Sequence, residues 1–229
     1  WQDVRTAINK AKRDGITDVL TTFKEAPFSV QTQIREISAQ WAGKKALPEM
    51  GFTLGGVDEL IDSRVRLLYA VDGNGKVLGV TSWLPTYRDG TIIGWTLDFM
   101  RHRTDSVNGI MEFLIARMAE RLRDAGNVEF MSLSAAPLAG MGSNESEHEE
   151  SEVLRHALQM VADIMEPAYG FHSLFRFKLK FHPDEEKVYI CYPDAAKLPQ
   201  ISLAVAQAYV PSLTPAEAMR FVRTIAPRD

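Results

Sequence analysis

The sequence predicts an α+β fold in which a mixed, mostly antiparallel sheet is flanked by helices. Two observations support this prediction. Short runs rich in β-branched and aromatic residues, or alternating in hydrophobicity, lie at 67–71, 77–84 and 91–99 and are typical of strands. Apolar residues then recur at helical spacing across 106–125. At 229 residues with 45% hydrophobic content, the chain is long enough for one sizeable core.

The remaining elements are expected in a regular order. A helix over 2–14 ends at Gly15, a strand-like run follows over 16–23, and a second helix covers 29–42. Asp72-Gly73-Asn74-Gly75 joins the strands at 67–71 and 77–84 and is a strong signal of a hairpin turn. Gly126 closes the long helix. Beyond it we expect strands at 129–133, 174–183 and 188–192, and helices at about 151–167, 198–210 and 215–225.

The junction between the strand at 91–99 and the long helix is the first candidate site. It holds a set of polar residues and a glycine: Asp98, Arg101, Arg103, Asp105, Asn108 and Gly109. The pattern places Asp98 at the end of the strand, with Arg101 and Arg103 on the turn at the positive N-terminus of the helix. A solvated loop with a helix cap is the alternative interpretation.

The segment 174–183 is the second candidate. It alternates strictly, so as a strand it would present Arg176, Lys178 and Lys180 on one face and apolar residues on the other. Three cations on one face suit an anionic ligand. A half-buried strand with a solvated basic face is the alternative.

Composition limits the class of protein. The net charge of −4 argues against a generic nucleic-acid binder, although basic clusters, among them Arg117, Arg121 and Arg123 on the long helix, can hold phosphates locally. The single cysteine, Cys191, excludes an intramolecular disulfide and is expected to be buried in a strand. No apolar run is long enough to cross a bilayer, which is the pattern of a soluble piece of a larger protein.

Several short pieces of the chain match one known family in order and spacing. They are 5–15, Trp41 with Lys44, 49–55, 97–101 with Asp105, Asn108 and Gly109, 136–138, 176–181, and Tyr192-Pro193 before Leu198-Pro199. No single piece is specific, but their order and spacing together are. On these pieces the chain resembles the C-terminal cytosolic domain of the bacterial phosphatidylglycerol lysyltransferases, also called the multiple peptide resistance factor family.

The resemblance implies a transferase of lipid metabolism that works at the cytosolic face of the bacterial cell membrane. Its partners would be aminoacyl-tRNA, which donates a lysyl or alanyl group, and the glycerol hydroxyl of phosphatidylglycerol, which accepts it. The product alters membrane surface charge and gives resistance to cationic antimicrobial peptides. Residues 1–45 would be a joining helix and lead-in segment. Residues 46–229 would be the second of two tandem aminoacyltransferase halves.

The order of predicted elements is that of the GNAT-type N-acyltransferase fold. Acetyl-CoA-dependent members carry a glycine-rich pyrophosphate loop, Q/R-x-x-G-x-G/A, between the central strand and the next helix. Here the junction 101–109 has one glycine. We therefore expect no acetyl-CoA, and no other cofactor. We also expect no metal, because His148 and His156 lack the H-E-x-x-H spacing of a zinc site.

With the resemblance, the junction and the basic segment predict one site. Asp98, Arg101 and Lys180 are the catalytic candidates, converging on one pocket: Asp98 orients the aminoacyl ammonium or accepts a proton, Arg101 binds phosphate, and Lys180 stabilises an oxyanion or pairs with phosphate. The substrate-binding candidates are Arg103, Asp105, Asn108, Arg176 and Lys178. Three alternatives stay open: another lipid, sterol or peptide acceptor; a catalytically silent binding module; and a structural ion pair between Asp98 and Arg101.

Overall fold

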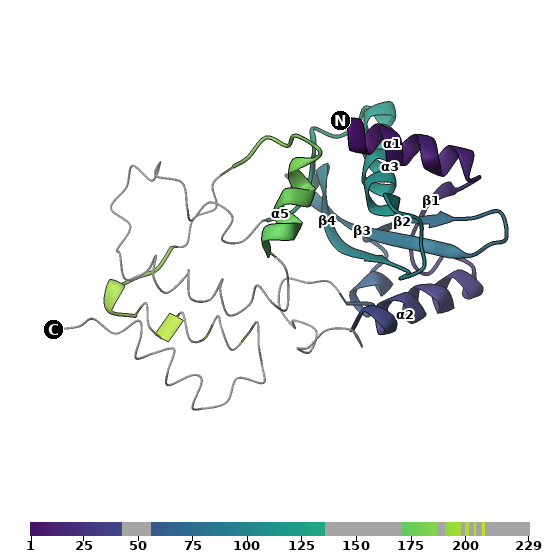
Figure 1. Cartoon of the computed structure of the whole chain (residues 1–229). Helices are drawn as coiled ribbons and strands as arrows, with labels where there is room; N and C mark the ends of the chain where they lie inside the picture. Colours follow the sequence, from purple (N-terminus) through teal and green to yellow (C-terminus); the bar gives the residue numbers. More distant parts are fainter. Residues whose placement is uncertain are drawn as a thin grey trace. The chain divides into compact units, whose positions relative to one another are not determined.

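A computed structural model describes residues 1–42, 56–135, 171–186 and 191–197, together with residues 200, 201, 204 and 208 (Figure 1). The chain divides into two compact units. The first comprises Trp1–Lys45, Leu54–Ser134 and Lys180–His182, and the second comprises Ala46–Thr53, Ala135–Leu179 and Pro183–Asp229.

In the described part of the first unit, five strands form one sheet in the order β1-β2-β3-β4-β5. The strands are β1 (Thr17–Thr21), β2 (Arg66–Val71), β3 (Val77–Arg88), β4 (Thr91–His102) and β5 (Phe130–Ser132). β1 to β4 pair antiparallel, and β4 pairs parallel with β5. The predicted α+β class with a mixed, mostly antiparallel sheet is therefore confirmed, and the strand order is that of a GNAT-type fold.

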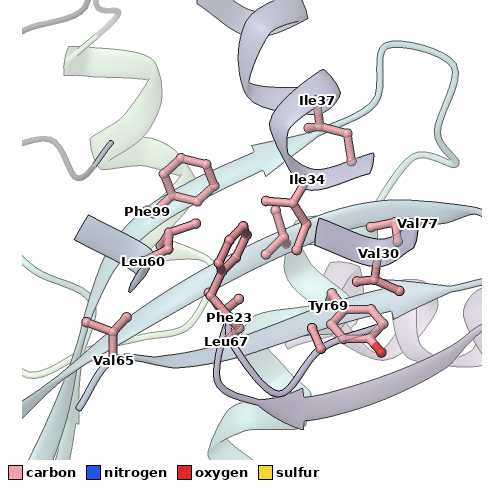
Figure 2. Close-up of a cluster of buried hydrophobic side chains, with 12 residues drawn as sticks. Phe23, Val30, Ile34, Ile37, Leu60, Val65, Leu67, Tyr69, Val77 and Phe99 are labelled. Carbon is pink, nitrogen blue, oxygen red and sulfur yellow. The ribbon is translucent and has the colours of Figure 1, made fainter. Parts of the chain in front are cut away.

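Helices cover both faces of this sheet. α1 (Gln2–Arg13) and α3 (Ile110–Ala125) lie on one side, and α2 (Phe28–Ala42) lies on the other (Figure 1). Between α2 and the sheet is a core in which Ile34, Ile37 and Phe99 are fully buried (Figure 2). The short 3-10 helix η1 (Glu59–Ile61) adds Leu60 to it. Residues 1–42, predicted as a lead-in segment, thus contribute two helices and a strand to the first unit, and their role as a joining segment stays a prediction.

The residues at the β2–β3 and β3–β4 turns account for the two hairpins of the sheet. In the predicted β2–β3 turn, the Asp72 carboxylate accepts hydrogen bonds from the amides of Asn74 and Lys76, each at 2.9 Å, and Gly75 has φ +79°. β3 then continues four residues past its predicted end. It turns directly into β4 at Asp89 and Gly90, both with positive φ, which is the requirement of a two-residue type I′ turn.

Two element boundaries at the candidate junction differ from prediction. β4 extends through His102 rather than ending at residue 99, and α3 begins at Ile110 rather than 106. The reason for the first is continued pairing, because Arg101 and His102 remain in register with Val80 and Gly79 of β3.

The predicted strand at 174–183 is wrong, because α5 (Phe171–Leu179) is a helix. Its exposed residues Ser173, Arg176 and Leu179 recur every third position, and Lys178 is buried. Leu174 and Phe177 are themselves three residues apart, so this short segment fits both periods. The alternation of charged and aromatic residues here therefore belongs to a helix and not to a β-strand.

Other expectations fall outside the described residues: the helices at 151–167 and 215–225 and positions 188–190 of the strand at 188–192. Residues 200, 201, 204 and 208 are helical, as expected for 198–210. Cys191 is exposed and lies in no strand, which corrects the prediction of a buried cysteine. It precedes a turn in which Asp194 caps the 3-10 helix η2 (Ala195–Lys197).

Candidate functional site

β4 carries a β-bulge at the centre of the candidate junction. Its residues Leu97 and Met100 pair with Trp83 and Thr81 of β3. The β3 partners are two residues apart and the β4 residues three, so β4 holds one extra residue in this stretch. Such an insertion bends the strand locally and redirects its side chains.

Ser82 lies between these two β3 partners, and Asp98 and Phe99 lie between the two β4 residues. The buried Ser82 hydroxyl accepts a hydrogen bond from the Phe99 amide at 3.0 Å, so a side chain supplies the acceptor for the bulged backbone. Phe99 is fully buried and Asp98 is half-buried. Ser82 thus helps to fix the backbone that carries Asp98, a role that the sequence analysis missed.

Arg101 lies inside β4, not on the turn as predicted, and only 5% of its surface is exposed. Its guanidinium carbon lies over the indole ring of Trp41 at 3.4 Å from the centroid, and 4.7 Å from the centroid of the Phe99 ring. Nη1 donates a hydrogen bond to the Met100 carbonyl at 2.9 Å. Aromatic faces stabilise a desolvated guanidinium by cation–π attraction. Sequence reasoning missed this use of Trp41, although the residue belongs to the resemblance.

Arg103 is the first residue after β4 and its side chain folds back onto the protein. Nε donates to the Val77 carbonyl at 2.8 Å, while Nη2 donates to Gln33 of α2 at 3.2 Å and approaches Glu36 at 3.4 Å. These contacts tie the junction to α2 and to the start of β3. They give Arg103 a structural role that is sufficient to explain its position.

The other polar residues of the junction lie at the surface. Asp105 pairs with Lys76 at 2.8 Å, and this hydrogen-bonded ammonium lowers the pKa of the Asp105 carboxyl. Asn108 is exposed in the turn before α3. Gly109 has φ +90°, and a Cβ there would come within 2.8 Å of the Ala7 side chain. The single glycine is therefore required by backbone conformation and by packing against α1.

Lys180, directly after α5, pairs with a residue of the first turn of α3. Its ammonium lies 2.7 Å from the Glu112 carboxylate, whose side chain is only 13% exposed. Lys180 and Arg101 thus contact helices on opposite faces of the sheet, namely α3 and α2. The convergence of Asp98, Arg101 and Lys180 on one pocket stays a prediction.

The two other cations of the basic segment belong to the second unit. Arg176 is exposed on α5. Lys178 is 7% exposed and donates a hydrogen bond to the Ala135 carbonyl at 2.7 Å. Burial lowers the pKa of the Lys178 ammonium to about 8, so this amine can exchange a proton slightly above neutral pH.

Two of the three arginines on the basic face of α3 form ion pairs within the fold. Arg117 and Arg121 each donate to the Asp18 carboxylate of β1 at 2.7 Å, and the Asp18 side chain is only 7% exposed. Arg123 pairs with its neighbour Asp124 at the surface. Two of these three cations therefore join α3 to the edge of the sheet.

Among the described residues, none of the helices combines the length and the apolar character that a bilayer crossing requires. The His, Cys, Asp and Glu side chains in the same part of the chain form no group of three that could hold a metal ion.

Comparison with known proteins gives the family. The model of the phosphatidylglycerol lysyltransferase C-terminal domain matches residues 1–192. An uncharacterized protein of Corynebacterium glutamicum is 42% identical over 210 residues, which are 92% of this chain and 26% of that protein. The phosphatidylglycerol lysyltransferase of Bacillus subtilis, a transferase by name, is 30% identical over 172 residues, which are 72% of this chain and 18% of that protein.

A solved structure agrees on the fold. L-PGS from Bacillus licheniformis matches 90% of this chain and 59% of its own chain with a TM-score of 0.69 at 24% identity. The chain spans about a quarter or less of the length of the two curated relatives. With a family model matching more than four-fifths of its residues, the chain belongs to the phosphatidylglycerol lysyltransferase C-terminal domain family.

Proposed function

We propose that this chain transfers an aminoacyl group, lysyl or alanyl, from aminoacyl-tRNA to the glycerol hydroxyl of phosphatidylglycerol. The observation that carries the proposal is the family match over residues 1–192. It is supported by the position of Arg101, a buried cation three residues after the half-buried acid Asp98 on one bulged strand.

The proposed donor is an aminoacyl ester rather than acetyl-CoA. A pyrophosphate loop needs several backbone amides turned toward the ligand, which glycine runs allow. The β4–α3 junction has one glycine, and contact with Ala7 and a positive φ account for it. An aminoacyl-tRNA needs no such loop, because its ester is already activated and its nucleotide end and ammonium group position it.

In the proposed reaction the lipid hydroxyl attacks the ester carbonyl and the bond to the tRNA ribose oxygen breaks. The hydroxyl proton ends on that ribose oxygen. Asp98 orients the aminoacyl ammonium, or accepts the hydroxyl proton transiently before it reaches the ribose oxygen. Arg101 holds the phosphate of the lipid. Lys180 stabilises the oxyanion, since an ammonium has three donors and can bind Glu112 and a further acceptor together.

The product changes the charge of the membrane surface. Lysyl transfer converts an anionic lipid into one with net positive charge, and alanyl transfer neutralises it. Cationic antimicrobial peptides bind anionic leaflets, and each basic residue contributes about 1 kcal/mol near such a surface. The transfer therefore weakens peptide binding. In the proposed function the reaction takes place at the cytosolic face of the membrane, as the family resemblance implies.

A reconstituted transfer assay tests the proposal. The complete gene product is mixed with phosphatidylglycerol vesicles and tRNA charged with radiolabelled lysine or, separately, alanine, and the lipid phase is counted. We expect label in the lipid with one of the two donors and no measurable acetyl-CoA binding by calorimetry. Label only in a peptide or sterol fraction would overturn the assignment of the acceptor, and tight acetyl-CoA binding would overturn the assignment of the donor. No transfer to any acceptor would favour the silent binding module.

A further inference from the structure

Among the described residues, Trp41 has the aromatic ring closest to the Arg101 guanidinium. The ring centroid lies 3.4 Å from the guanidinium carbon, closer than the 4.7 Å of Phe99. Cation–π contacts operate out to about 6 Å and are strongest with tryptophan and in desolvated places. Arg101 is 5% exposed, so this contact is desolvated.

The position of Trp41 is set by a helix that is fixed at several points. Ile34 and Ile37 of α2 are completely buried in the core of Figure 2. Gln33 donates a hydrogen bond to the Gly75 carbonyl at 3.1 Å and accepts one from the Val77 amide at 2.9 Å. α2 is therefore anchored to the sheet about two turns before Trp41.

We propose that Trp41 is a positioning residue for the phosphate of phosphatidylglycerol: its indole face fixes the plane of the Arg101 guanidinium and directs the guanidinium edge at that phosphate. The inference rests on the proposed function and adds a residue to it. A guanidinium has its donors in the plane and binds phosphate in a bidentate fork, so the orientation of the plane decides the strength of the contact.

The lipid is the ligand that the surroundings of Arg101 favour. A tRNA backbone is held by exposed basic surfaces, and binding weakens with salt. Arg101 is instead buried against two aromatic rings, so only a small group can reach its edge. One phosphodiester on a glycerol headgroup fits this description.

The test separates the two substrates in steady-state kinetics of the complete gene product. We expect Trp41→Leu to raise KM for phosphatidylglycerol in mixed vesicles about tenfold, roughly 1.4 kcal/mol, and to leave KM for aminoacyl-tRNA unchanged. Trp41→Phe keeps an aromatic face and should stay within about threefold. Arg101→Lys keeps the charge without the planar fork and should raise the same KM. Trp1→Leu, at a tryptophan that is 63% exposed, is the matched control.

A double variant distinguishes positioning from general support of the fold. If Trp41 acts through Arg101, Trp41→Leu should add nothing to the KM of Arg101→Ala. Additive losses, or an unchanged KM for phosphatidylglycerol in Trp41→Leu, would overturn the inference. A rise in KM for aminoacyl-tRNA alone would overturn the lipid assignment and place the RNA phosphate at Arg101.

The inference can fail separately from the proposed function. Absence of transfer by the wild-type protein refutes the function. In that case binding of glycerophosphoglycerol, the soluble headgroup, is measured by calorimetry. Affinity about tenfold weaker in Trp41→Leu than in Trp1→Leu supports the role of Trp41. Equal affinities, or no binding by the wild-type protein, overturn it.

Discussion

Arg101 and Arg103 are two residues apart and look equivalent in the sequence, yet their surroundings differ. Arg101 lies within β4, buried against the rings of Trp41 and Phe99. Arg103 lies just beyond the strand and donates its hydrogen bonds to Val77 and Gln33. The guanidinium of Arg101 is thus held mainly between aromatic faces, with one hydrogen bond from Nη1 to the Met100 carbonyl. The guanidinium of Arg103 is held by polar contacts with β3 and α2.

The comparison extends to the acids that flank the two arginines. Asp98 sits in a bulge whose backbone is held by Ser82, while Asp105 pairs with Lys76 at the surface. We therefore propose the inner pair, Asp98 and Arg101, as the substrate-contacting residues of this junction. The outer pair, Arg103 and Asp105, holds the β4–α3 junction in place.

The largest expected effect is on the acid of the inner pair. Asp98→Asn in the complete gene product should lower aminoacyl-lipid formation tenfold to a hundredfold, roughly 1.4 to 2.7 kcal/mol, because the neutral amide no longer holds an ammonium or accepts a proton. The transfer assay and a thermal melt check this together. Asp124→Asn, an exposed acid on α3, is the control. Near-normal transfer by Asp98→Asn would make Asp98 structural.

The next effect concerns the bulge that carries the inner pair. Ser82→Ala removes the acceptor of the buried Phe99 amide and should lower the free energy of unfolding by about 1–2 kcal/mol. Urea denaturation measures this. Ser106→Ala, which removes an exposed hydroxyl near His102, should change stability by less than about 0.5 kcal/mol. Equal stability of the two variants would show that the Ser82 hydroxyl does not support the bulge.

A smaller effect tests the buried cation of the second unit. Burial lowers the pKa of Lys178 from 10.5 to about 8, so between these values the unfolded state binds more protons than the folded state. Stability contributed by Lys178 therefore rises with pH above 8, and below pH 8 the penalty for burying the ammonium applies in full.

Replacement of Lys178 should show this dependence as a difference between variants. Lys178→Met should be more stable than the wild-type protein at pH 7, and the difference in unfolding free energy should shift by at least about 1 kcal/mol toward the wild type by pH 10. Urea denaturation at both pH values measures it, with Lys197→Met at an exposed position as control. A difference that stays constant with pH would contradict the lowered pKa.

The parts of the fold that were predictable are those specified by local chemistry. Asp72-Gly73-Asn74-Gly75 marked the β2–β3 turn because the Asp72 side chain and Gly75 meet its geometric needs. The apolar spacing marked α3. Asp89-Gly90 carried the same kind of turn signal between β3 and β4, but Pro85 and the polar residues after it obscured the strand that leads there.

What could not be predicted depends on contacts between distant segments. The segment 174–181 fits both periods, and only packing selects the helix. The end of β4 is set by its pairing with β3. The contact of Trp41 with Arg101 could not be predicted because it joins α2 to β4, about sixty residues later in the chain. From the sequence, Arg117 and Arg121 suggest a basic surface. In the structure both pair with Asp18 of β1, which is about a hundred residues earlier in the chain.

One paired measurement tests the distinction between the two arginines most directly. Arg101→Ala and Arg103→Ala are made in the complete gene product, and aminoacyl-lipid formation and the free energy of unfolding are measured for each. We predict that Arg101→Ala lowers transfer at least about tenfold with little loss of stability. Arg103→Ala should lower stability by about 1–2 kcal/mol and keep transfer within about threefold. Loss of transfer in proportion to loss of stability in both variants would contradict the account.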